Sequence, residues 1–243
     1  MRVNRFLAQA LNVSRRKADG YIKEGRVKLN GRVLSSFVNI TEDDELEFDG
    51  EPVKIESGRK LYFAFYKPPL VISSTKDDEG RQTVCDFFGN FKQKLICVGR
   101  LDYLSEGLLI VTNDGKFANL LMHPRFKIRK TYLVKTKDVL GADTLKRMSE
   151  GIKLEDGFFK PLVIKRTSNP NWVVISIDNG RNRILRRFFK AFDVRISKLK
   201  RIAIGDIELG DLKEGEYRAL AKKEIESLKS TIYKGSRRLD IGE

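Results

Sequence analysis

The sequence predicts an α+β protein with a small N-terminal α/β module at residues 1–50 and a larger domain at residues 61–232. Three observations support this. Helical spacing is followed by a hairpin signal at the start, residues 51–60 have the Gly, Pro, Ser and charge content of a linker, and short β-type runs then alternate with helices. This alternation is typical of a mixed, mainly antiparallel sheet with flanking helices. Residues 233–243 are expected to form a flexible tail.

The N-terminal module is expected to contain two short helices and a hairpin. Residues 4–11 place apolar side chains at helical spacing, and Ser14 is positioned to cap a second helix. The dipeptide Asn30-Gly31 separates two short strand-like runs and favours a tight type I′ turn. A further strand near residues 45–48 completes the module.

The larger domain is expected to contain eight strand segments and three helices. The strand candidates are residues 61–66, 71–74, 95–99, 107–112, 131–136, 161–166, 172–177 and 194–209, and the helix candidates are residues 117–122, 142–151 and 182–191.

Charge is the most informative bulk property of the chain. There are 48 Lys and Arg residues against 33 Asp and Glu, a net charge of +15, which favours a polyanionic partner and above all nucleic acid. Residues 1–32 hold nine basic and two acidic residues, whereas residues 41–51 hold seven acidic residues and no basic one. The asymmetry indicates a cationic face rather than a generally lysine-rich composition. Its candidate phosphate contacts are Arg5, Arg15, Arg16, Lys17 and Arg26.

Several function classes receive no support. Cys85 and Cys97 have no metal-type spacing and are expected to be reduced core thiols. The sole histidine, His123, has no clustered second ligand, so no metal site is expected. The N-terminus lacks a signal-peptide core, and no apolar run is long enough for a membrane span. A cytoplasmic protein without a membrane partner is the expectation.

One polar loop carries the strongest candidate for chemistry. VGRLDYLSEGLLIVTNDG places Asp102 between two apolar runs that are expected to be central strands, with Arg100, Tyr103 and Glu106 close by. An ordinary turn carboxylate is one interpretation of Asp102. A paired-carboxylate hydrolase that uses Asp102 and Glu106 is another, and spacing alone does not reject it.

A second basic segment follows the strand at residues 172–177. Residues 181–201 hold nine basic residues and one acid, with aromatic and aliphatic residues at helical spacing, so an amphipathic helix with a basic face is expected. The start of this helix would face an anion, either phosphate or a buried carboxylate. Its candidate contacts are Arg181, Asn182, Arg183 and Arg187.

Three motifs in order, VGRLDYLSEGLLIVTNDG, RKTYLV and NGRNRILRR, resemble those of the RsuA/RluB/RluE/RluF group of pseudouridine synthases. The first 50 residues resemble the S4 RNA-binding module that commonly precedes this catalytic domain. The resemblance implies an enzyme that isomerises uridine to pseudouridine without cofactor, metal or redox change. It places the catalytic aspartate at Asp102, a tyrosine at Tyr132 and an arginine at Arg186.

The roles that the resemblance implies agree with the chemistry of these side chains. Asp102 acts as base or nucleophile, Arg186 keeps it charged, and Tyr132 offers a ring for stacking and a hydroxyl near the departing C5 proton. Whether Asp102 attacks the sugar, adds to the base or removes a ribose proton stays open. Arg100 is a candidate to fill the gap left by an extruded uridine.

The chain departs from the family pattern at two places. Lys67-Pro68-Pro69-Leu70 lacks the glycine that usually ends this stretch, so its turn must form without glycine's conformational freedom. Ile184 stands where a glutamine is expected.

Ribosomal RNA is the expected substrate, with large-subunit 23S RNA favoured and 16S RNA or tRNA as alternatives. A monomer is the simpler expectation. The competing interpretation is a non-catalytic ribosome-binding or assembly factor, which would tolerate Asp102→Asn without loss of function. A carboxylate hydrolase is a third interpretation, although the basic charge argues against small neutral substrates.

Overall fold

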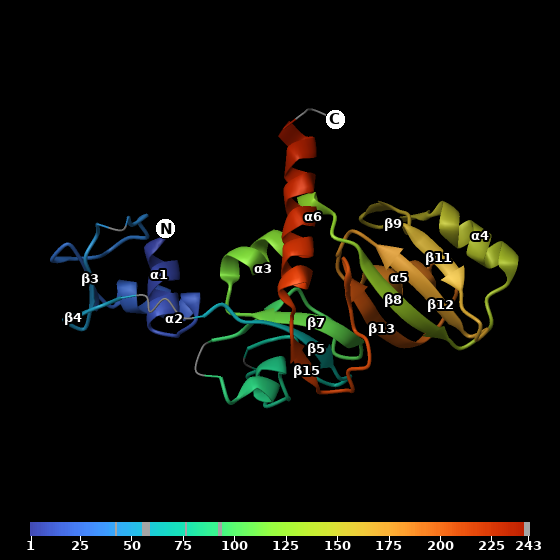
Figure 1. The fold of residues 1–243 in the computed structure, drawn as a ribbon, viewed down its shortest axis with the longest axis horizontal. Helices are drawn as coiled ribbons and strands as arrows, with labels where there is room; N and C mark the ends of the chain where they lie inside the picture. Colours follow the sequence, from blue (N-terminus) through green and yellow to red (C-terminus); the bar gives the residue numbers. More distant parts are fainter. Residues whose placement is uncertain (42, 55–58, 76, 92–93, 241–243) are drawn as a thin grey trace. The chain divides into compact units, whose positions relative to one another are not determined.

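The computed structural model describes residues 1–41, 43–54, 59–75, 77–91 and 94–240, and of residues 233–240 the backbone alone. The chain divides into two compact units (Figure 1). The first comprises Met1–Arg59 with Phe91–Lys94, and the second comprises Lys60–Asn90 with Leu95–Glu243.

The first unit packs two helices on a small antiparallel sheet. Its elements are α1 (Val3–Ala10), α2 (Arg15–Lys23), β1 (Val27–Leu29), β2 (Arg32–Val33), β3 (Leu46–Phe48) and β4 (Glu51–Pro52), with strand order β2-β1-β3-β4. The Ser14 side chain accepts a hydrogen bond from the Lys17 N–H and caps α2, as the sequence predicts. Asn30 and Gly31 both have positive φ, as a type I′ turn requires.

The prediction of a linker at residues 51–60 is wrong at its start. Glu51 and Pro52 form β4, which pairs with β3 and extends the sheet of the first unit. Residues 55–58 lie outside the described residues.

The second unit is built on a mixed, mainly antiparallel sheet, which confirms the predicted fold class. Its order is β11-β12-β8-β13-β7-β5-β15, with β14 paired to β13 and β6 paired to β7. Among the strand pairs that the structure describes, all but the β7–β13 pair at the middle of the sheet are antiparallel. The strands are β5 (Tyr62–Lys67), β6 (Ile96–Val98), β7 (Glu106–Thr112), β8 (Lys130–Thr136), β11 (Val163–Arg166), β12 (Trp172–Ile177), β13 (Ile196–Ile204), β14 (Ile207–Glu208) and β15 (Tyr217–Ala219).

Helices and a separate hairpin cover this sheet (Figure 1). They are η1 (Val84–Phe88), α3 (Gly115–Met122), η2 (Pro124–Phe126), α4 (Ala142–Glu150), α5 (Ile184–Lys190) and α6 (Lys222–Asp240), with the hairpin β9 (Ile152–Leu154) and β10 (Gly157–Phe159). One core cluster joins α3 and α6 to β5, β6 and β7, and a second joins α5 to β8, β12 and β13. None of the described helices has both the length and the apolar character that crossing a bilayer demands.

Four expectations from the sequence are corrected by the structure. Residues 71–74 make a single parallel bridge, Ile72 with Thr83, because the backbone of Ile72 bonds to Gln82 and Val84 on either side of Thr83. Strand β6 pairs with β7 alone and is not central. The predicted helix at residues 182–191 begins at Ile184, since Arg183 adopts a left-handed conformation. The expected tail is helical to Asp240, because buried Leu228 and Ile232 anchor α6 to the core.

Candidate active site

Asp102 lies in the loop that connects β6 to β7, and the segment after β5 holds this loop in place. The Ser73 hydroxyl accepts from the Leu101 N–H and donates to the Leu101 carbonyl, both at 3.0 Å. The Leu70 N–H donates to the Tyr103 carbonyl at 2.7 Å, and the Ser105 N–H donates to the Asp102 carbonyl at 2.9 Å. The backbone of Asp102 is therefore fixed on both sides, while its side chain is 37% exposed.

Arg186 connects α5 to this loop. Its Nε lies 3.5 Å from Asp102 Oδ2, and its Nη2 donates to Ser105 Oγ at 3.1 Å. Helix α5 presents Arg186 at this position because its other face buries four large apolar side chains in the core, namely Ile184, Leu185, Phe188 and Phe189. The guanidinium stabilises the negative charge of Asp102 in a partly desolvated setting.

Tyr132 belongs to the same region. It is a buried residue of β8, and it shares a hydrophobic cluster with Leu101, the neighbour of Asp102, and with the apolar face of α5. The structure thus brings the loop of Asp102, the helix of Arg186 and the strand of Tyr132 together around one core cluster.

A row of residues in register crosses the sheet beneath this region. Lys67 on β5 pairs with Gly107 on β7, Gly107 with Arg201 on β13, and Arg201 with Tyr132 on β8. Residues in register on neighbouring strands project from the same face of a sheet. Gly107 has φ of 105°, and a Cβ there would lie 2.3 Å from the Arg201 carbonyl oxygen, so the close approach of β7 and β13 requires glycine.

Lys67 was not identified from the sequence as a site residue. Its side chain is fully buried, and Nζ donates to the carbonyls of Pro68 at 2.6 Å and Ser105 at 2.8 Å. Burial lowers the pKa of Lys67 to about 8, although the charges of Glu106 and Asp102 act in the opposite direction. Lys67 is therefore a further tether of the loop that carries Asp102.

Arg201 is the second residue that the sequence interpretation missed. It is only 2% exposed, its Nε donates to the Leu108 carbonyl at 2.7 Å, and its guanidinium carbon lies 6.0 Å from the centre of the Tyr132 ring. Its Nη2 is buried without a hydrogen-bond partner among the described residues. The sequence did offer a signal for Lys67 and Arg201. Arg201 lies within a segment predicted to be a strand and Lys67 directly follows one. Buried positions in such segments are normally apolar, so a charged residue there indicates a specific role.

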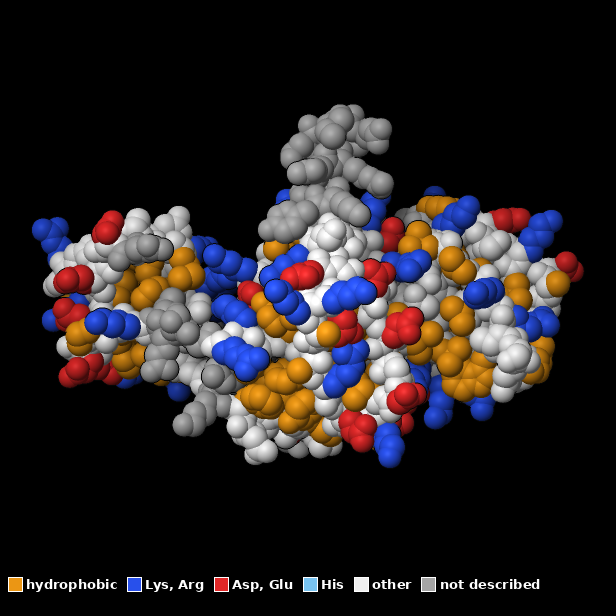
Figure 2. All heavy atoms as spheres, viewed as in Figure 1, with side chains coloured by type: hydrophobic (Ala, Val, Ile, Leu, Met, Phe, Trp, Pro, Cys, Tyr) orange, Lys and Arg blue, Asp and Glu red, His pale blue; other side chains and the backbone are white. Residues whose placement is uncertain are grey.

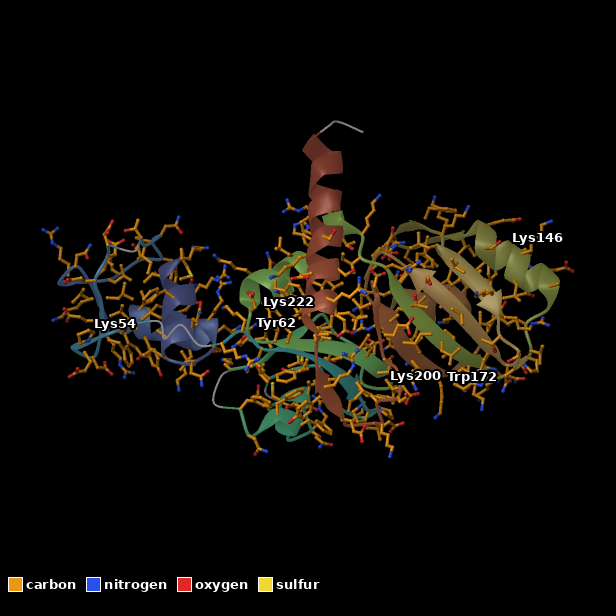
Figure 3. All side chains as sticks on the ribbon, viewed as in Figure 1. Lys54, Tyr62, Lys146, Trp172, Lys200 and Lys222 are labelled. Carbon is orange, nitrogen blue, oxygen red and sulfur yellow. The ribbon has the colours of Figure 1, made fainter. Side chains whose placement is uncertain are left out.

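The paired-carboxylate interpretation gains no support from the structure. Glu106 is the first residue of β7, it is 6% exposed, and burial raises its pKa. It pairs in register with Lys200, whose Nζ lies 4.5 Å from the centre of the Tyr66 ring (Figure 3 labels Lys200). Because successive residues of a strand face opposite sides, Glu106 projects away from the row that contains Gly107.

The basic segment at the start of α5 makes its observed ionic contacts within the protein. Arg187 Nη1 and Nη2 donate to the two carboxylate oxygens of Asp156 at 2.8 and 2.7 Å, and these bonds hold the pKa of Asp156 below its usual range. Arg181 donates to the Asp156 carbonyl and to the Phe158 carbonyl. These two arginines therefore attach the β9–β10 hairpin to α5. Asn182 and Arg183 have exposed side chains.

The predicted RNA contacts of the first unit differ in their availability. Arg15, Arg16 and Lys17 are exposed in the first turn of α2, and Arg5 is half-buried on α1. Arg26 instead forms a bidentate pair with Asp49, at 2.9 and 2.5 Å, and lies over the rings of two aromatic residues, Tyr21 and Phe48. Figure 2 shows the acidic side chains of this unit mainly over β3 and β4.

Arg100, which precedes Asp102 by two residues in the same loop, is exposed. Among the residues that the structure describes, His, Cys, Asp and Glu side chains form no group of three or more that could hold a metal ion.

Comparison with known proteins identifies the class of the chain. Residues 61–191 match the family model described as RNA pseudouridylate synthase, and residues 1–46 match the S4 domain. The chain therefore belongs to the RNA pseudouridylate synthases, and it is an enzyme of the RsuA/RluB type with an S4 domain. This confirms the resemblance seen in the sequence and favours an enzyme over the non-catalytic factor.

Particular relatives are similar over nearly the whole chain. Ribosomal large subunit pseudouridine synthase B of Bacillus subtilis is 40% identical over 235 residues, which cover 94% of this chain and 96% of the relative. The protein of the same name from Yersinia pestis is 33% identical and covers all of this chain and 83% of its own. A crystal structure of a pseudouridylate synthase superposes with a TM-score of 0.67 at 32% identity, covering 94% of this chain and 99% of the other.

Proposed function

We propose that this enzyme converts a specific uridine of ribosomal RNA to pseudouridine, with Asp102 as the catalytic carboxylate and large-subunit RNA as the favoured substrate. The observation that carries the proposal is the tethered loop that presents Asp102, partly exposed, to Arg186 at 3.5 Å. The names of the relatives, which refer to the large ribosomal subunit, support the choice of RNA.

The reaction breaks the bond between C1′ and N1, rotates the uracil and joins C1′ to C5, after which the C5 proton leaves. The carboxylate of Asp102 acts as nucleophile or base in these steps. Arg186 holds the charge and the orientation of that carboxylate, and Tyr132 faces the base from the sheet. N1 takes up a proton while C5 releases one, so the nucleotide keeps its composition and no redox change is required; any bond that Asp102 forms as a nucleophile is broken again before the product leaves.

The target must leave its stack to reach Asp102. A uridine in structured RNA is inaccessible, so the enzyme extrudes it, and Arg100, an exposed residue two positions before Asp102, occupies the space left in the RNA. Arg5, Arg15, Arg16 and Lys17 of the first unit supply phosphate contacts, as do Asn182 and Arg183 beside α5.

Tritium release from RNA that carries 5-tritiated uridine tests the proposal, because only substitution at C5 frees the label. The wild type should release tritium from a large-subunit RNA fragment, and Asp102→Asn should bind the same fragment but lose several orders of magnitude in rate. Asp138→Asn is the matched control, since Asp138 is an exposed aspartate in a surface ion pair of 3.7 Å. Equal rates for Asp102→Asn and the wild type would refute the role of Asp102. Tritium release from tRNA, with none from ribosomal RNA, would refute ribosomal RNA as the substrate.

A further inference from the structure

Three exposed apolar side chains border Asp102. Tyr103 and Leu104 follow it directly in the loop and are 42% and 60% exposed, and Leu70 is 56% exposed. The hydrogen bond from the Leu70 N–H to the Tyr103 carbonyl holds Leu70 beside the same loop. We call Leu70, Tyr103 and Leu104 the apolar rim.

The conformation of Leu70 is unfavourable for a leucine. Its φ is +62°, in the left-handed region where a residue with a Cβ is strained. A glycine would make the same N–H bond without strain, and the exposed side chain gains little from burial. Neither the turn nor the packing of the core explains why a leucine occupies this position, and backbone strain of this kind concentrates at ligand-binding sites.

The chemistry of the rim restricts its ligand within RNA. The three side chains carry no charge, so they offer no ionic contact to phosphate. The flat faces of nucleobases are the part of RNA that suits such a surface, because base stacking on aromatic rings tolerates any sequence. Extrusion of the target uridine also exposes the face of the adjacent base, which needs a new stacking partner.

We propose that the apolar rim is a stacking platform for the nucleobase next to the target uridine. The Tyr103 ring covers the face of that base, while Leu70 and Leu104 exclude water from its edges. The platform selects RNA in which this neighbouring base is unpaired and free to stack. The inference rests on the proposed function, because it takes Asp102 as the place where the uridine reacts.

Fluorescence of 2-aminopurine placed beside the target uridine tests the platform without relying on turnover. In the wild-type complex the 2-aminopurine should be quenched by Tyr103. Tyr103→Ala should restore its fluorescence and weaken RNA binding about tenfold, the size expected for loss of one stacked base. Tyr103→Phe should retain both properties, because the ring remains.

Salt dependence separates stacking from a phosphate contact. Tyr103→Ala and Leu104→Ala should leave the slope of log K against log salt unchanged, since no charge is removed. Leu70→Gly removes a rim side chain while relaxing the backbone, so its weaker binding could not be attributed to loss of folding. Phe158→Ala is the matched control, because Phe158 is 63% exposed on β10, outside the rim.

Binding and quenching by the rim variants equal to those of Phe158→Ala would overturn the proposal, as would a shallower salt slope for Tyr103→Ala. Asp102→Asn separates this result from a failure of the proposed function. It should quench and bind like the wild type while releasing no tritium. Intact quenching with full tritium release from Asp102→Asn would refute the catalytic role and leave the stacking platform in place.

Discussion

Replacing Lys67 with methionine should reduce activity far more than stability. The buried ammonium has a pKa of about 8 instead of the ordinary 10.5, so burying its charge at neutral pH costs about 3 kcal/mol. Its two hydrogen bonds to carbonyl groups contribute about 1.5 to 3 kcal/mol each. Methionine fills a similar volume, but it removes both the cost of burying the charge and the contribution of the two hydrogen bonds. The cost offsets much of the contribution, so the unfolding free energy should fall by only about 0 to 3 kcal/mol.

Activity should fall because the Ser105 carbonyl loses its tether next to Asp102. A displacement of about 1 Å at the reacting group costs roughly 100-fold in rate, which should appear in kcat rather than in KM. Single-turnover tritium release measures the rate, and urea unfolding of the same preparation measures the stability. The wild-type rate should also decline as pH rises through about 8, when Lys67 loses its proton, and Lys67→Met should lack this decline.

The pH dependence of stability has a defined sign. The folded pKa of Lys67 is below the unfolded one, so between about pH 8 and 10.5 the unfolded chain binds more protons, and wild-type stability should rise with pH there relative to Lys67→Met. Lys130→Met is the control, because burial also lowers the pKa of Lys130 to about 8, but its ammonium donates to the Ile128 carbonyl and not to the Asp102 loop. Full activity of Lys67→Met, or an equal loss in Lys130→Met, would refute the reasoning.

Three further predictions follow from the site and the first unit. Gly107→Ala should unfold the second unit or destabilise it by more than about 4 kcal/mol, because its Cβ would overlap the Arg201 carbonyl; circular dichroism on heating measures this, and a near-normal Tm would contradict it. Arg186→Lys should slow tritium release at least tenfold, since one ammonium cannot replace both the Asp102 and Ser105 contacts, and an unchanged rate would argue against the pair. Arg16→Ala should reduce the slope of log K against log salt by about 1 in filter binding, and an unchanged slope would remove Arg16 from the RNA contacts.

Local signals in the sequence predicted much of the first unit and the sheet. Ser14 and the Asn30-Gly31 turn act on residues close to them in the chain, so the cap of α2 and the β1–β2 hairpin could be inferred directly. Residues 107–112 predicted a strand because a short continuous apolar run is typical of a strand buried on both faces, and β7 is buried along its whole length.

Contacts between distant segments could not be read in the same way. Arg187 was expected to contact phosphate, but its observed partner is Asp156, 31 residues away. The roles of Lys67 and Arg201 depend on partners that are distant in the sequence, since Ser105 lies 38 residues from Lys67 and Leu108 lies 93 residues from Arg201. The roles of Asp102, Tyr132 and Arg186 came from the family resemblance, and they stay predictions.

The parallel pairing of β7 with β13 has a consequence for synthesis of the protein on the ribosome. Residues 1–52 contain all the elements of the first unit, which can form while most of the chain is still unmade. Of the four strands that carry the row from Lys67 to Tyr132, β13 is translated last, and it must insert between β7 and β8. Arg201 can therefore pair with Gly107 and Tyr132 only after residue 201 has left the ribosome. A nascent chain can therefore complete the secondary-structure elements of its S4 domain long before it completes the row of residues from Lys67 to Tyr132.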